Sequence, residues 1–195
     1  NVLLLISRPE WQNTVFLSYN AKNCANTFIL KAFLDISMKP EVFESGNKIN
    51  YFHINFMNQT FLNASMFVSG TLVEWIKTFK IDEELRFFPE TLNFEENYET
   101  VGSQPQLKAY IKFSDTSEEV RQKQAFHDAW NLAPRQQWSF KKELLASVES
   151  ETTVVFKTCL AFLKSCFEFQ ALIKQQCGHS KESDFVHPFN DKIMS

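Results

Sequence analysis

The side chains best suited to bind a metal or move a proton are the four histidines and four cysteines of this 195-residue chain. The histidines are His53, His127, His179 and His187, and none lies four residues from another histidine or from a cysteine. Zinc sites use paired ligands at such short spacings, for example Cys-x-x-Cys. Cys177 and His179 form a close pair, but both lie at the end of an expected helix, where nothing rigid would hold an ion. The sequence therefore predicts no metal and no cofactor.

Acidic residues and nucleophiles give no stronger signal for catalysis. Residues 82–84 read Asp-Glu-Glu and residues 95–96 read Glu-Glu, and such runs beside Lys80 and Arg86 are typical of a solvated surface. His53 falls on the polar face of an expected strand. The chain has no Gly-x-Ser-x-Gly, phosphate-binding loop or Gly-x-Gly-x-x-Gly motif. We expect no catalytic residue, and an enzyme with a site assembled from distant residues is one alternative.

Charge limits the partners that the chain can bind. Its 20 Lys and Arg stand against 23 Asp and Glu, for a net charge of −3, whereas a dedicated polyanion binder needs clustered cations. The segment best suited to nucleic acid, or to an acidic partner, contains Arg135, Trp138, Lys141 and Lys142. The same segment is also consistent with a loop that enters a helix and buries its tryptophan.

The cysteine pattern and the chain ends favour an intracellular protein, cytoplasmic or nuclear. Cys159 and Cys166 would lie two turns apart on one helix, which is too far for a disulfide. Free thiols are typical of a reducing compartment. No apolar run reaches the length that spans a bilayer, and residues 2–6 are too few for a signal peptide. Because the chain begins at Asn1 with that apolar run, we expect a domain excised from a longer protein.

Two glycosylation sequons, at Asn58 and Asn63, occur about as often as chance predicts. One of them falls inside an expected strand, so they do not favour a secreted protein.

The first half of the chain reads as strands. In residues 27–36 the even positions are apolar and the odd positions include Thr27, Lys31 and Asp35, which predicts a strand with one buried face. Alternation also predicts strands within residues 51–56, 62–68 and 107–113, and short apolar segments are expected to form strands within residues 2–6, 14–19 and 85–88.

Helices are expected between and after these strands. Residues 72–79 have helical spacing behind a capping box formed by Thr71 and Glu74. A second capping box, Thr116 with Glu119, predicts a helix that ends at Pro134. Further helices are expected from Ser139 and from residue 150 to residue 177.

The last expected helix carries two adjacent apolar stripes. One stripe comprises Val155, Cys159, Phe162, Cys166, Phe169 and Ile173, and the other comprises Phe156, Leu160, Leu163 and Phe167. A helix with so wide an apolar face packs against two surfaces. Either both surfaces belong to the protein's own core, or one is a partner chain that binds Phe156, Leu160, Leu163 and Phe167. Residues 179–195 read as a flexible tail, in which Phe185 and Phe189 are further candidates for contact with a partner.

These elements predict an α+β fold: an antiparallel meander of about six or seven strands, one short helix between strands, and C-terminal helices on one sheet face. Residues 1–178 are expected to form one domain. The element order resembles that of the transducer domain of type II topoisomerase B-type subunits and the head of coiled-coil DNA end-joining scaffolds. The resemblance implies a subunit of a DNA-processing complex. The main expectation is a non-catalytic interaction or scaffold module of an intracellular multi-subunit assembly, with other protein subunits as partners.

Overall fold

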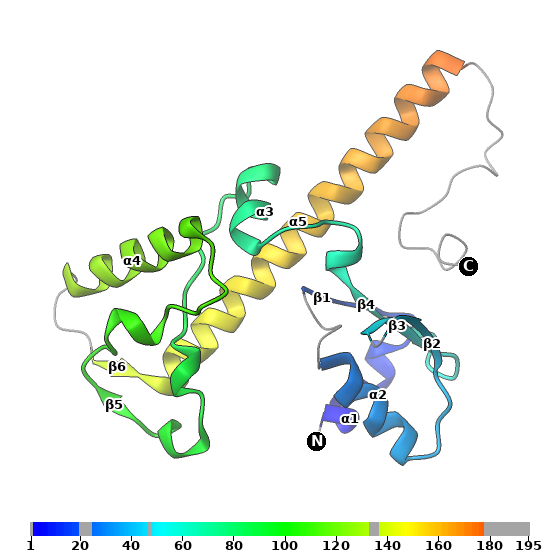
Figure 1. Ribbon diagram of the computed structural model, residues 1–195. Helices are drawn as coiled ribbons and strands as arrows, with labels where there is room; N and C mark the ends of the chain where they lie inside the picture. The colour runs from blue at the N-terminus through cyan, green and yellow to red at the C-terminus, as the bar shows by residue number, and fades with distance from the viewer. Residues whose placement is uncertain (1, 20–24, 47, 133–136, 178–195) are drawn as a thin grey trace. The chain divides into compact units, whose positions relative to one another are not determined.

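The computed structural model describes residues 2–19, 25–46, 48–132 and 137–177 (Figure 1). The chain divides into two compact units, one formed by Asn1–Val68 and Phe156–Ser195 and the other by Ser69–Val155. The described residues form five helices, a four-stranded sheet and a two-stranded sheet, so the predicted α+β class is confirmed. One domain over residues 1–178 stays a prediction.

The first unit is built on the four-stranded sheet, which is mixed rather than a meander. Its strands are β1 (Val15–Ser18), β2 (Glu41–Ser45), β3 (Lys48–Ile54) and β4 (Gln59–Asn63), in the order β1-β4-β3-β2. β3 pairs antiparallel with both β2 and β4, as a meander requires. β1 instead pairs parallel with β4. The expected continuous meander of six or seven strands is therefore wrong in its topology, because a helix rather than a strand follows β1.

That helix is α2 (Ala25–Asp35), and it replaces the strand predicted over residues 27–36. The segment satisfies two periods, because apolar residues also recur at Ile29, Leu30 and Phe33. In the structure this second set faces inward, with Leu30 and Phe33 buried, whereas Phe28 is 70% exposed. The helical period therefore describes the packing. Buried Asn26 joins the start of α2 to the sheet by donating a hydrogen bond to the Ile49 carbonyl (3.1 Å).

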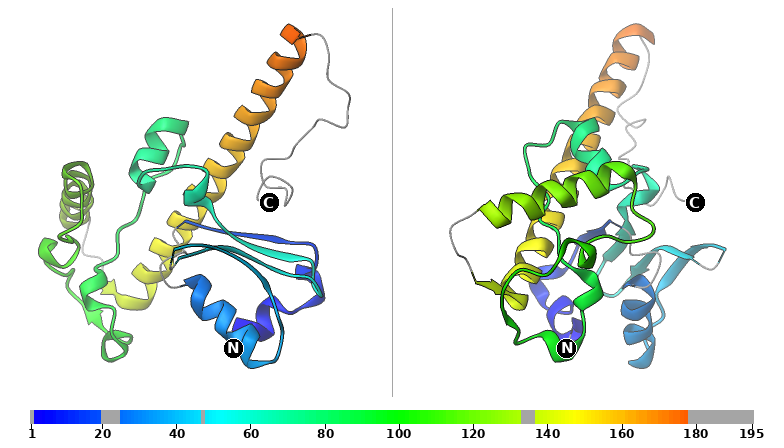
Figure 2. Two further views of the ribbon diagram at one scale, coloured as in Figure 1. Left: turned by 45° about the vertical axis from the view of Figure 1, so that its right-hand side comes forward. Right: turned by 60° about the vertical axis from the view of Figure 1, so that its left-hand side comes forward.

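Stacked phenylalanines form the core between α2 and the sheet. Phe61 on β4 stacks on Phe16 of β1 and on Phe52 of β3, with ring centroids 4.6 Å apart in both pairs. Phe33 of α2 meets Phe52 and Phe61 edge to face. This alternation of stacked and edge-on rings suits the aromatic quadrupole. Figure 2 shows α1 and α2 on the same side of the sheet.

The N-terminal segment is also helical, which corrects the strand expected at residues 2–6. It forms α1 (Val2–Ile6), followed by a 3-10 turn at Pro9–Trp11. Gln59, fully buried on β4, anchors both by donating to the carbonyls of Ile6 (2.7 Å) and Trp11 (2.9 Å). Five residues are too few for a stable isolated helix, so α1 depends on these tertiary contacts.

The second unit begins with α3 (Leu72–Phe79), as predicted. The Thr71 hydroxyl accepts from the Glu74 amide, and the Glu74 carboxylate accepts from the Thr71 amide (2.7 Å), so the capping box is confirmed. Trp75 is buried and donates from Nε1 to the Ser69 carbonyl. Gly70 precedes the cap at φ +102°, and a Cβ there would lie 2.6 Å from the Glu74 carboxylate.

The strands predicted at residues 85–88 and 107–113 are not formed. Residues 82–88 are irregular, and Leu107–Ala109 is a 3-10 turn. Tyr110 is the buried residue of this second segment, while Phe113 is fully exposed, opposite to the expected alternation. The second sheet pairs β5 (Val101–Gly102) with β6 (Trp138–Ser139).

Two helices complete the described chain. α4 (Ser117–Leu132) starts at the predicted Thr116–Glu119 box, where the Glu119 amide donates to the Thr116 hydroxyl (3.2 Å). α5 (Phe140–Cys177) is one helix of 38 residues, which corrects the expected break at Ser150. The Ser150 hydroxyl donates to the Ser147 carbonyl and the Thr153 hydroxyl to the Glu149 carbonyl. Both hydroxyls thus bond back to the preceding turn rather than capping a new helix.

Candidate functional site

The histidines that the structure describes are held by neighbours rather than presented to a substrate. His53 Nδ1 lies 2.9 Å from the Thr60 hydroxyl. His127 contacts the Pro105 carbonyl through Nε2 (3.2 Å), and Asn131 through Nδ1 (3.1 Å). Within the described part of the chain, no three His, Cys, Asp or Glu side chains come together as metal ligands would. His179 and His187 lie outside the described residues.

One buried ion pair lies in the second unit. Lys123 on α4 donates to the Asp115 carboxylate (2.6 Å), and both side chains are less than 10% exposed. Burial alone would raise the pKa of Asp115, but hydrogen bonds from the Lys112 amide and from Lys123 outweigh it, so the pKa falls below its usual value. Lys123 also lies 5.9 Å from the centre of the Phe87 ring. A carboxylate so fully paired suits a structural role better than proton transfer.

Glu143, which is half-buried, and Tyr110, which is buried, are two further ionisable groups in the second unit. Burial raises the pKa of Glu143, and the opposing charges of Arg86 and Lys142 only partly offset this effect. Burial likewise raises the pKa of Tyr110. Burial among neighbouring side chains is the main cause of both shifts.

The segment proposed to contact nucleic acid has its aromatic ring inside the protein. Trp138 is buried with Phe88 and Phe140 in one hydrophobic cluster. Lys141 forms an ion pair with Glu99, and Lys142 is exposed. Arg135 lies outside the described residues. Because stacking on a base needs an accessible ring, the described part of this segment offers cations without a stacking platform.

The second apolar stripe of α5 lies on its solvent side. Phe156 is 60% exposed, Leu160 49% and Phe167 37%, while Leu163 is half-buried. The buried Val154 and Thr158 of the same turns project on the opposite side of the helix, and the buried Val155 and Cys159 lie between them and the stripe. Phe185 and Phe189, the other candidates for contact with a partner, lie outside the described residues.

The side chains of the first stripe change from buried to exposed along α5. Val155 and Cys159 are buried, and Phe162 is half-buried and packs on Phe67 with ring centroids 6.3 Å apart. Further along the same stripe, Phe169 and Ile173 are exposed. The last turns of α5 therefore present apolar side chains on both stripes.

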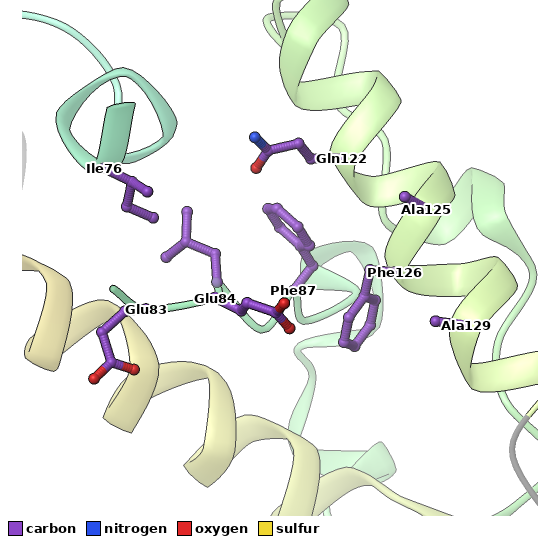
Figure 3. Close-up of a pocket in the computed structure, with 9 residues that line it drawn as sticks. Ile76, Glu83, Glu84, Phe87, Gln122, Ala125, Phe126 and Ala129 are labelled. Atoms are coloured by element: carbon purple, nitrogen blue, oxygen red, sulfur yellow. The ribbon is translucent and has the colours of Figure 1, made fainter. Parts of the chain in front are cut away.

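A pocket of about 390 Å³ lies in the second unit, and it was not predicted from the sequence. Figure 3 shows residues from α3, from the irregular segment after it and from α4 converging on this space. Small Ala125 and Ala129, one turn apart on α4, leave room that larger side chains would fill. Its lining residues are Ile76, Glu83, Glu84, Leu85, Phe87, Gln122, Ala125, Phe126 and Ala129.

Comparison with protein families, with curated proteins and with solved structures finds no significant match. Among the helices that the structure describes, none combines the length and hydrophobicity needed to cross a membrane.

Proposed function

We propose that this chain is a non-catalytic protein–protein interaction module and that α5 is its docking element. The observation that carries the proposal is the exposed stripe of Phe156, Leu160 and Phe167, which lies beside the buried face of α5. Together these side chains expose roughly 300 Å² of apolar surface, which is the lower end of the size of the largest apolar patches on typical soluble proteins, patches that are often functional. Covering each of them would contribute about 2–3 kcal/mol.

The chemistry of the described residues supports a non-catalytic role. The histidines are engaged by neighbours, the buried carboxylate of Asp115 is paired, and no group of metal-binding side chains is assembled in the described chain. The free thiols of Cys159 and Cys166 support an intracellular location. On this basis we place the module in a larger intracellular assembly of protein subunits.

The test uses the full chain with an affinity tag and compares three forms. Leu160→Asp places a charge on the exposed stripe, and Phe28→Asp places the same charge at an exposed phenylalanine of α2. Both variants should keep the wild-type circular dichroism spectrum. We expect the wild type and Phe28→Asp to retain the same stable set of proteins on purification, and Leu160→Asp to lose it.

Retention of the same proteins by Leu160→Asp would contradict the assignment of α5 as docking element. The identities of the lost proteins also decide the second candidate function, a subunit of a DNA-processing complex. That candidate requires DNA-processing enzymes among the proteins that depend on Leu160.

A further inference from the structure

We infer that the stripe of Phe156, Leu160, Leu163 and Phe167 binds an acidic amphipathic helix of a different protein. The inference rests on the proposed function, because it assigns a class of partner to the same face of α5. It follows from three observations: the spacing of the stripe, the charges on its two edges, and the poor match that a second copy of this chain would make.

The spacing specifies a helix as the partner. The four residues follow one another at intervals of four, three and four, which is the repeat of apolar positions in a two-stranded coiled coil. Such a row offers holes along one line for the side chains of a second helix. An extended peptide, whose side chains alternate every two residues, would not match it.

The charges beside the stripe specify an acidic partner. Lys157 and Lys164 directly follow Phe156 and Leu163, so they lie along one edge of the stripe, seven residues apart. The Lys164 side chain is 78% exposed and has a long 3.9 Å ion contact with Glu168. Residues at such flanking positions contact the partner helix in a coiled coil, where opposite charges determine partner choice.

The other edge of the stripe belongs to the protein's own fold. Cys159 and Cys166 directly precede Leu160 and Phe167 there, and they are buried and half-buried, respectively. A partner helix therefore meets the stripe from the lysine edge, where Lys157 is half-buried and Lys164 is exposed.

A second copy of this chain would not supply the required acids. In a parallel pair, Lys164 would lie opposite Cys159 of the other copy, and Lys157 opposite Thr152. In an antiparallel pair, the lysine edges would face each other and repel. The charge pattern thus favours a different chain with Glu or Asp beside its own apolar row.

The experiment measures binding of two designed probes to the full chain by fluorescence anisotropy. Both are labelled synthetic helices of about four heptads with leucine in the core positions. One carries glutamate at the flanking positions and the other carries lysine. We expect the acidic probe to bind at least about tenfold more tightly than the basic probe, and its affinity to fall as salt is raised.

Variants of the chain locate the binding face. Leu160→Asp should weaken the acidic probe about tenfold or more, while Phe28→Asp should bind like wild type. Lys164→Glu keeps the apolar stripe but reverses one flanking charge, so the preference should shift toward the basic probe. Circular dichroism confirms that each variant is folded.

Two outcomes overturn the inference. The first is equal or weaker binding of the acidic probe, including no binding of either probe. The second is a dimer of the wild-type chain in sedimentation that Leu160→Asp converts to monomer, since a second copy would then occupy the stripe. In both cases the proposed docking role still stands if Leu160→Asp loses the co-purifying proteins, so the two proposals fail separately.

Discussion

At the scale of single residues, Asp115 and Lys123 show how burial changes the contribution of an ion pair to stability. Their side chains are 6% and 9% exposed, whereas Lys31 and Asp35 on α2 form a pair whose side chains are more than 60% exposed. Removing one partner of a buried pair leaves an uncompensated charge away from water, whereas solvent takes over when an exposed pair is broken.

We therefore expect Lys123→Ala to lower the free energy of unfolding by about 3–5 kcal/mol. The matched change Lys31→Ala should lower it by less than about 1 kcal/mol. Urea denaturation followed by circular dichroism measures both values. Equal effects of the two substitutions would contradict the structural role assigned to the buried pair.

The same pair makes stability depend on pH. Because the pKa of Asp115 is lower in the folded than in the unfolded state, its contribution is complete above the unfolded value of 3.8 and is lost as the pH falls through the folded pKa. We expect the free energy of unfolding of the wild type to decrease as the pH is lowered below about 4. Asp115→Asn should be less stable at neutral pH and should lose less on acidification, as unfolding at a series of pH values would show.

Cys159 and Cys166 should differ in reactivity. Burial raises the pKa of Cys159 to about 11, whereas Cys166 is half-buried. Because the thiolate is the reactive form, Cys159 stays protonated and shielded at pH 8. We expect an alkylating reagent to modify Cys166 at least about tenfold faster in the native protein, measured by peptide mass spectrometry. In denaturant the two rates should become similar, and equal native rates would contradict the burial of Cys159.

At the scale of elements, local chemical signals predict better than alternation. Both capping boxes, at Thr71 and Thr116, are formed as predicted, because each depends on atoms three residues apart. Alternation at residues 27–36 is misleading, because a densely apolar segment fits the periods of a strand and of a helix together. Which period applies is decided by packing against β3 and β4, and a single sequence does not contain that information.

The helical assignment of residues 25–35 makes a direct test possible. Phe33 faces the stacked rings of Phe52 and Phe61, whereas Phe28, five residues earlier, is exposed. We expect Phe33→Ala to lower the free energy of unfolding by about 3–5 kcal/mol. Phe28→Ala should change it by less than about 1 kcal/mol. A strand over these residues, with its even positions buried, would give the opposite order.

At the scale of the whole molecule, the sequence predicts the two apolar stripes of α5 but not how much of each stripe is exposed. The two stripes follow from helical spacing. Which residues of a stripe are buried depends on which other segments pack on the helix. Along the first stripe, the side chains change from buried to exposed between Cys159 and Phe169. The pocket beside Ala125 and Ala129 was missed for a related reason, since it needs three segments that only the folded chain brings together.

This change along α5 should be visible in hydrogen exchange. The helix is buried around Val154 and Cys159 and exposed at Phe169 and Ile173, and helices gain most of their stability from packing. We expect amide protection, measured by mass spectrometry of peptides, to be highest near residues 154–159 and to fall steadily toward residue 173. Uniform protection from Phe140 to Ile173 would show that the last turns are stabilised without a partner.

Asn63 has a practical consequence for how the protein is produced. Its side chain is fully buried at the end of β4, and its Oδ1 accepts from the Ser65 amide and hydroxyl. Yet Asn63-Ala64-Ser65 is an acceptor sequence for oligosaccharyltransferase, which acts on chains before they fold. A bulky, hydrated sugar attached there could not enter the interior beside Leu62 and Ala64. Glycosylation of Asn63 in a secretory expression host would thus prevent the chain from folding, whereas expression in the bacterial cytoplasm would leave Asn63 unmodified.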